Sequence, residues 1–589
     1  MQDEEDDSGE ESSSTSEIVA EDRPSHLYSL FQNDMLSIDT QATVRDLNER
    51  PSKTAVASLD AARTMLHRLM PPREDIYAVS AHVSRWHRVL HEVLPLTTLP
   101  KSRQDLLSSY ETVTQPDADT MALAAWLLGV ATISQQMPQE AHSPDGVARS
   151  FQKRFNFARV VCEVVERHIL SHDSLIGTVE GIEVALLYLR AQLGWGHMHK
   201  VWLNLRRIIS IAELIGLPRA ARMIQMQNNL SPPPGQVLHV KASLWTSLCS
   251  IDRIAGVLGN FPCAATRNPS AADQPLVIDG AVQPRVYILR LSNIATQVQD
   301  LDDLSMDYIS EAEVYRSVLH IDNELRLLAN ECPRQWWVAL PNDVEPAHLL
   351  QLVHYVLVMR THLVFMMRRD VQGLYSHSQQ SGLEACCEVL QRWQIMRRSL
   401  PLGFFLCRMI DLQAFTAAVV ALLASENARI THRPLVAGNG VGLSECVAQT
   451  VELLHEKARD PVGSDVARQA LQAIQSLAAM LQGQGDASEG GYLKLTVPRL
   501  GKIHVRRNHD NNEKGLRMAE SIPQQAQQWP SASRVATQAE PPMDAAAAVD
   551  STQMQDLWGQ GPFSWFIEDD CGAMFEDISP DLDFLLSTK

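Results

Sequence analysis

The chain has 589 residues, of which 45% are hydrophobic and 21% charged, enough apolar material for one large core or two fused cores. Its net charge of −19 lies at the ends, because residues 1–22 hold ten acidic and no basic side chains, and residues 551–589 hold eight acidic and one basic. Residues 23–550 carry a net charge of only −2, so we expect any effect of the negative charge on binding partners to come from the two tails.

The start of the chain and its cysteines indicate an intracellular protein. Acidic residues stand where a secretory signal would need a basic and then an apolar stretch, which excludes a signal peptide. The nine cysteines are odd in number and scattered through apolar helical patterns, so we expect reduced core thiols. The most apolar long segment, 349–367, contains His354, Arg360 and His362; we therefore expect a buried helix and no membrane partner.

In chain order, residues 1–24 have the high charge and low hydrophobicity of a disordered acidic tail. Residues 25–482 then show apolar side chains at helical spacing, with almost no strand-like alternation and no fixed-period repeat. The sequence predicts an all-α, irregular multi-helix domain, long enough for two subdomains. The predicted helices cover 56–70, 76–94, 122–134, 147–169, 286–301, 312–328, 349–369, 383–398, 404–425, 446–458 and 465–481.

Two further apolar helices, separated by a polar loop, lie within 184–265. The first passes through Trp202 and meets Gly216-Leu217-Pro218, where glycine suits a left-handed closing position and proline blocks continuation. The second runs from His239 to Leu258, contains Asp252-Arg253, and stops at Gly259. A charged pair inside an apolar helix more often bridges neighbouring helices than binds a ligand, so we expect a structural role.

These residues resemble the regulatory "middle homology" region of fungal-specific transcription factors, and the resemblance covers roughly residues 25–480. Tyr77, Trp86, His87 and His91 resemble the opening helix of that domain. Pro218 replaces a frequent histidine, and Asn260-Phe261 interrupts the usual Gly-Arg-Pro close. The segments that carry the resemblance are Leu186-Leu187-Tyr188, Gly194, Trp202, Leu205–Ala212, Leu214–Leu217, Leu244-Trp245, Ile251–Arg253 and Leu258-Gly259. The signature residues to which we give a structural role are Trp202, Gly216, Leu217, Trp245, Asp252, Arg253 and Gly259.

The resemblance implies a nuclear transcription regulator whose helical domain controls activity through a metabolite, homo- or heterodimerisation or a corepressor. DNA contact in that family comes from a binuclear zinc cluster of six cysteines. This chain contains no Cys-x-x-Cys, so we assign no metal ligands. Two alternatives stay open: the protein begins upstream of Met1 with a zinc-binding cluster, or it reaches promoter DNA through a partner.

Other patterns that could carry chemistry are weak. His87 and His91 lie four residues apart but lack a third ligand, so a packed or surface pair is expected. There is no Gly-x-Ser-x-Gly nucleophile motif. We therefore assign no catalytic or cofactor-binding residue and expect no enzyme. The alternative function is a cytoplasmic helical scaffold or small-ligand-binding protein.

After the helices, residues 483–550 have the composition of a low-complexity linker. Within it, 492–497 is predicted as a lone strand, and the basic cluster 502–507 is either a solvated loop or a nuclear import signal.

Residues 551–589 alternate acidic and aromatic side chains. Acidic repulsion keeps such aromatics available for grooves on coactivators, which predicts an activation segment; the alternative is docking on the chain's own helical domain. Its aromatic residues are Trp558, Phe563, Trp565, Phe566, Phe575 and Phe584.

Overall fold

A computed structural model describes thirteen stretches of the chain and leaves the two predicted tails outside the described residues. The described stretches are 53–82, 102–137, 144–227, 236–264, 274–304, 310–338, 345–368, 373–401, 403–431, 442–460, 464–481, 492–497 and 501–506. Almost all of this part of the chain is helical, which confirms the predicted all-α class.

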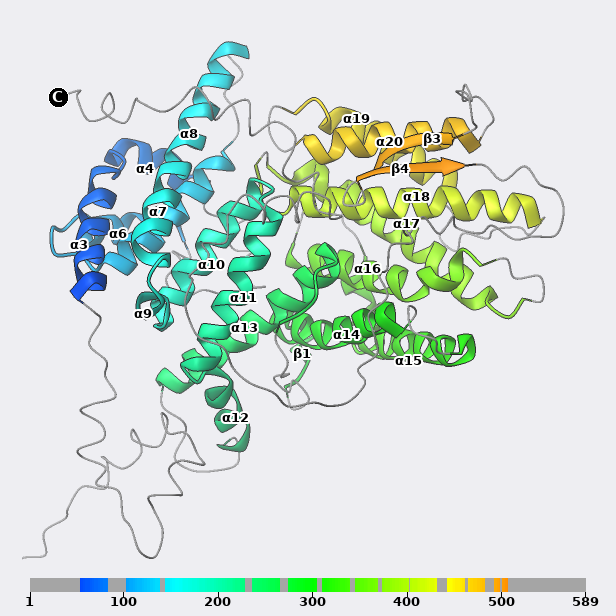
Figure 1. Ribbon diagram of the computed structural model, residues 1–589, viewed down its shortest axis with the longest axis horizontal. Coiled ribbons are helices and arrows are strands. Elements are labelled where there is room, and N and C mark those ends of the chain that lie inside the picture. Colours follow the sequence, from blue (N-terminus) through cyan, green and yellow to red (C-terminus); the bar gives the residue numbers. More distant parts are fainter. Residues whose placement is uncertain are drawn as a thin grey trace, which may run out of the picture.

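The N-terminal half of the described chain builds one group of helices (Figure 1, blue through cyan to blue-green). Several begin with a side-chain cap; Asp119, for example, accepts from the backbone N–H of Ala122 at the start of α7. The elements are α3 (Lys53–Arg68), α4 (Arg73–Ser80), α6 (Arg103–Val113), α7 (Thr120–Gln135), α8 (Pro144–Val165) continuing into a π-helical turn (Glu166–Leu170), α9 (Asp173–Ile176), α10 (Val179–Gly194), α11 (Met198–Leu214), α12 (Leu217–Gln227) and α13 (Gln236–Gly259).

The C-terminal half forms the second group (Figure 1, green to orange). Helices α16 and α17 are its central pair, and both pack on α18. The elements are α14 (Pro284–Leu304), α15 (Glu311–Asn330), a 3₁₀ turn (Arg334–Trp337), α16 (Pro346–Met366), α17 (Ser376–Ser399), α18 (Cys407–Thr431), α19 (Leu443–Lys457) and α20 (Asp465–Leu481).

The described residues also form two antiparallel hairpins, one between α13 and α14 and one after α20. β1 (Val277–Ile278) and β2 (Ala281–Val282) are joined by Asp279-Gly280, both at positive φ, the conformation that a two-residue hairpin turn requires. β3 (Tyr492–Val497) pairs with β4 (Gly501–Arg506), Tyr492 opposite Arg506. The expectation of a lone strand followed by a basic loop was wrong: the basic residues form the partner strand, inside the segment predicted as linker.

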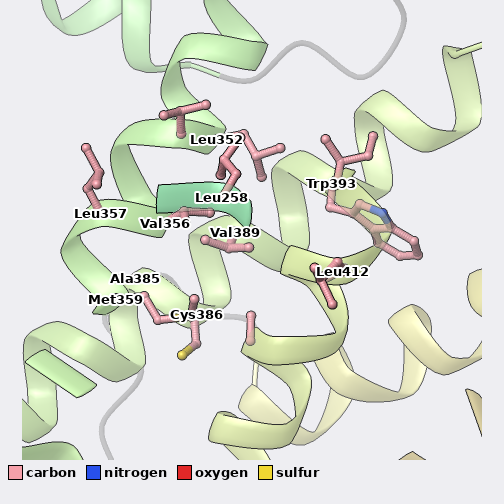
Figure 2. Packing of buried hydrophobic residues seen from close by; sticks show 14 of the residues in the cluster. Leu258, Leu352, Val356, Leu357, Met359, Ala385, Cys386, Val389, Trp393 and Leu412 are labelled. Atoms are coloured by element: carbon pink, nitrogen blue, oxygen red, sulfur yellow. The ribbon is translucent and has the colours of Figure 1, made fainter. Parts of the chain in front are cut away.

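The described apolar residues form two separate clusters, which we call the first core and the second core. The first core contains Trp126 and Tyr188, and the second contains Phe365 and Trp393. Helix α13 belongs to both, since Leu248 is buried in the first core and Leu258 in the second. Figure 2 shows Leu258 within the same packed cluster as side chains of α16, α17 and α18. One continuous helix therefore connects the two cores.

Two helices of the second core are long and apolar enough to span a membrane by length and composition, namely Ala347–Met366 and Cys407–Glu426. Their apolar windows are 67% and 72% buried inside the protein. This burial fits core helices, and it agrees with the prediction for 349–367.

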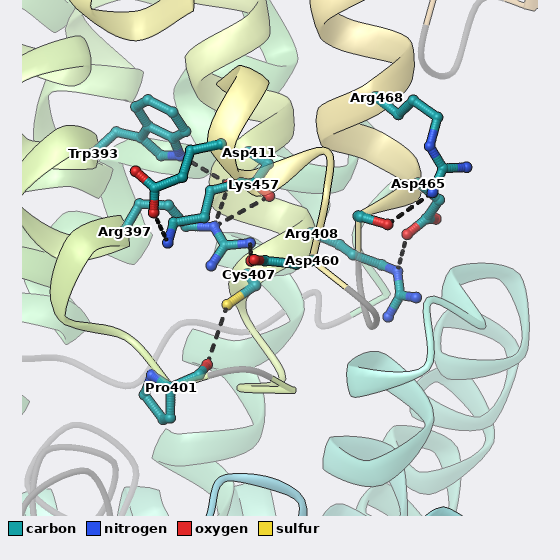
Figure 3. A network of polar contacts seen from close by, with 12 residues as sticks. Trp393, Arg397, Pro401, Cys407, Arg408, Asp411, Lys457, Asp460, Asp465 and Arg468 are labelled. Atoms are coloured by element: carbon teal, nitrogen blue, oxygen red, sulfur yellow. Dashed lines mark hydrogen bonds and ion pairs between the residues drawn. The ribbon is translucent and has the colours of Figure 1, made fainter. Parts of the chain in front are cut away.

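Polar contacts fix the second core, and Figure 3 shows those around Arg397 and Arg408. Asp411, fully buried, accepts from Nε of Arg397 at 3.0 Å and from the indole N–H of Trp393 at 2.9 Å. Arg408 donates to Oδ1 of Asp465 at 2.9 Å, and its other nitrogen donates to the carbonyl of Gly194, at the end of α10. Arg408 thus connects the second core to the first.

Candidate ligand cavity between the two cores

Helix α11 ends where the sequence predicts a stop. Leu214 is its last residue, and Gly216 has φ +82°, the left-handed conformation available to glycine. Leu217 follows and is fully buried in the first core.

The prediction of a polar loop directly after this stop was wrong. Pro218 lies in the first turn of a new helix, α12, where a missing N–H costs nothing because it would have no partner. Helix α12 then packs along α13. A proline that ends one helix can therefore also begin the next.

Helix α13 carries the charged pair deep in the protein. Asp252 and Arg253 are 2% and 1% exposed. Nη1 of Arg253 donates to Oδ1 of Asn293 on α14 at 2.8 Å, and Oδ2 of Asp252 accepts from the backbone N–H of Ala264 at 2.8 Å. Burial lowers the pKa of Arg253. The pair ties α13 to α14 and to the segment that follows α13, at the level where the helix passes from one core to the other.

The end of α13 packs on the signature tryptophan of α11. Asn260 takes the left-handed conformation with φ +53°, and a side chain on Gly259 would come within 2.5 Å of the Phe261 ring. Phe261 stacks on Trp202, with ring centroids 5.7 Å apart, and the indole N–H of Trp202 donates to the carbonyl of Pro262 at 3.3 Å. Trp202 and Gly259 therefore shape one wall of the junction.

A cavity of about 160 Å³ lies at this junction. Its wall is apolar and draws on both cores: Leu189 on α10, Leu205 on α11, Ala255 on α13, Val353 on α16 and Met409 on α18. An apolar cavity of this size is comparable to engineered cavities of about 150 Å³ that stay dry and bind benzene. The arrangement can therefore accept a small apolar molecule.

Few polar groups reach the cavity. Gln413 uses its amide N–H to bond the carbonyl of Leu258 at 2.9 Å, so this group is satisfied within the protein. Arg190 lines the wall, and burial lowers the pKa of its guanidinium to about 10, which leaves it charged at neutral pH. The cavity thus combines an apolar wall with a few buried polar groups, including the cation of Arg190 and the carboxyl group of Asp252.

The structure brings some of the predicted site residues together and not others. Trp202 and Asp252 line the cavity, whereas Gly216 and Trp245 do not. The six aromatic residues of the predicted activation segment, and the pair His87 and His91, lie outside the described residues.

Sequence reasoning missed Arg190, Phe405 and Met409 as cavity residues. An arginine inside the apolar run of α10 was the one visible signal. Phe405 and Met409 look like ordinary core positions.

The chain is similar to curated fungal transcription regulators. It is 26% identical over 409 residues to a dehydrocurvularin biosynthesis regulator of Alternaria cinerariae, covering 66% of this chain and 51% of the relative. It is 24% identical over 410 residues to the Aspergillus terreus protein of the same name, covering 65% and 54%, and 24% identical over 400 residues to the transcription factor sdnS of Sordaria araneosa, covering 64% and 49%.

These similarities confirm the predicted resemblance to fungal transcription factors. The chain spans about half the length of these relatives. No family model matches the chain, and no solved structure matches it.

Proposed function

We propose that this chain regulates transcription of biosynthetic genes in the nucleus of a fungus, with the two-core helical region as its control domain. The similarity to named regulators over about two thirds of the chain carries the proposal. Promoter DNA is contacted through a zinc-binding cluster outside this sequence or through a partner, and control includes dimerisation or a small-molecule effector. No catalytic activity is part of the proposal.

Output comes from residues 551–589, whose acidic and aromatic side chains bind coactivators. We test this with the full chain fused to a heterologous DNA-binding domain and a reporter gene. Deleting 551–589, or replacing Trp565 and Phe566 with alanine, is expected to abolish activation. Deleting the equally long segment 511–549 is the control and is expected to leave most of the activity. A silent wild-type fusion would instead favour the scaffold alternative.

The cavity between the cores supports control by an apolar effector. Its walls come from α10 and α11 on one side and α16 and α18 on the other, so a bound molecule contacts both cores at once. A ligand that prefers one arrangement of the cores shifts the population toward it by its difference in affinity for the two arrangements. Binding in this cavity would thereby alter the relation between the two halves of the control domain.

Benzene is a suitable probe, because its size matches the cavity. We expect benzene to raise the melting temperature of the full chain, and Ala255→Leu, which fills the cavity from α13, to remove that increase. Gln236→Leu adds a similar side chain on the exposed start of the same helix and is expected to keep it. An equal increase in both variants would show that benzene binds elsewhere.

A further inference from the structure

Three potential metal ligands converge from three helices that contribute to the second core. Asp322 on α15, His362 on α16 and His377 on α17 place their ligand atoms within 4.8 Å of one another. Asp322 and His362 are buried, whereas the side chain of His377 is 40% exposed. Three successive α-helices thus contribute one group each to a single cluster, which has solvent on one side.

The spacing of these groups already approaches that of a metal site. Four ligands at about 2.0–2.1 Å from a tetrahedral zinc ion are separated from each other by about 3.3 Å. Nε2 of His362 lies 3.3 Å from Oδ1 of Asp322, and Nε2 of His377 lies 2.8 Å from Oδ2. Small movements of the two imidazoles would therefore suffice to surround an ion.

The orientation of His362 supports a ligand role. Its side chain has 0% exposure, and its Nε2 faces Oδ1 of Asp322 at 3.3 Å, an ion-pair distance without the geometry of a hydrogen bond. Its Nδ1 lies 3.0 Å from the hydroxyl of Ser378, which is itself fully buried. When Nδ1 donates to that hydroxyl, Nε2 presents its lone pair to the cluster, the arrangement that outer partners impose on metal-binding histidines.

A cation already contacts this cluster in the structure. The Nη2 of Arg326 is 2.6 Å from Nε2 of His377 and also bonds the carboxylate of Asp322. The Arg326 side chain is 54% exposed, one turn beyond Asp322 on α15, so it can turn outward into solvent. A guanidinium and a metal ion would compete for the same two ligand atoms.

We propose that Asp322, His362 and His377 form a binding site for a divalent transition-metal ion of the zinc class, with Arg326 as its internal competitor. Two imidazoles and one carboxylate are a ligand set that zinc accepts, and the exposed side of His377 leaves a fourth position for water. The ion would connect α15, α16 and α17. Nothing in the proposed transcriptional function requires this site.

The test titrates Zn²⁺ into chelator-treated full chain by calorimetry, with Co²⁺ absorption as a second readout. Wild type is expected to bind zinc at this site, and His377→Ala to weaken that binding more than about tenfold because a ligand is lost. Arg326→Ala is expected to bind zinc severalfold more tightly because the competing charge is gone. His320 is an exposed histidine on α15, the helix of Asp322 and Arg326, so His320→Ala is the matched control. This variant is expected to bind zinc as wild type does.

Zinc affinity unchanged in His377→Ala would overturn the proposal. So would the absence of zinc binding in both wild type and Arg326→Ala, because the cluster would then be only an arginine-bridged polar network. A gain in affinity in Arg326→Ala that disappears in the double variant with His377→Ala would establish the site, since a purely structural network predicts neither change.

Discussion

Asp411 shows how strongly one side chain can matter when it is buried beside its counter-ion. Replacing it with asparagine keeps its shape but leaves the guanidinium of Arg397 largely uncompensated in the second core. We expect Asp411→Asn to lower the free energy of unfolding by about 3–5 kcal/mol, measured by urea denaturation. Asp465→Asn breaks the exposed pair with Arg408 and should cost less than about 1 kcal/mol. Equal losses in the two variants would contradict this account.

His354 makes stability depend on pH. Burial, with a smaller effect of the charge on Arg392, lowers its pKa from 6.5 to about 3, and its Nδ1 lies 2.8 Å from the hydroxyl of Tyr287. Between about pH 3 and pH 6.5, His354 therefore binds a proton in the unfolded chain but not in the folded chain. This contribution to stability is complete above pH 6.5 and decreases as the pH falls toward 3.

We expect the His354 contribution to decrease by about 2 kcal/mol between about pH 7.5 and pH 5. His354→Asn keeps an acceptor near the Nδ1 position but has no titrating group. Urea denaturation at the two pH values should give a correspondingly smaller difference for this variant. An identical pH dependence in wild type and His354→Asn would exclude His354 as its source.

At the scale of single elements, the end of α11 allows the cost of backbone strain at a helix end to be measured separately from side-chain packing. Gly216 has φ +82°, and a Cβ added there would meet no atom within 4 Å, so substitution costs only backbone strain. Gly216→Ala is expected to lower the free energy of unfolding by about 1 kcal/mol. Gly216→Asn should lose less, because asparagine tolerates the left-handed conformation. A larger loss with asparagine would indicate a role other than helix termination.

The sequence predicted a helix or its end correctly where the side chains of that segment alone determine its secondary structure. The apolar spacing of 465–481 predicted α20 with the bounds that the structure shows, and Gly216 predicted the end of α11. Helix α12 was missed because Pro218 is compatible with both a helix stop and a first turn. β4 was missed because its basic residues resemble a solvated loop until a partner strand is present.

The cavity and the three-residue cluster were beyond sequence reasoning, since both depend on tertiary contacts. The lining residues Leu189 and Met409 have the apolar spacing of any core helix, and more than two hundred residues separate them. Asp322, His362 and His377 show no short metal-binding spacing. Helical packing alone brings each set together.

For the whole molecule, we expect the two cores to unfold together because α13 is buried in both. Ile251→Pro interrupts α13 between the cores and should cost about 3 kcal/mol or more. Hydrogen exchange of α7 and α17 should be coupled in wild type and become independent in this variant. Gln236→Pro, at the first position of the same helix, should leave the exchange coupled. If α7 and α17 already exchange independently in wild type, α13 does not couple the unfolding of the two cores.

The continuity of α13 also sets a rule for insertions and deletions. Each residue of an α-helix turns the chain by about 100° and advances it by about 1.5 Å. One residue gained or lost between Cys249 and Val257 would therefore rotate the second core against the first and separate Arg253 from Asn293. The number of residues in this stretch therefore fixes the rotation of one core relative to the other. We expect related proteins with this architecture to vary its side chains far more freely than its residue count.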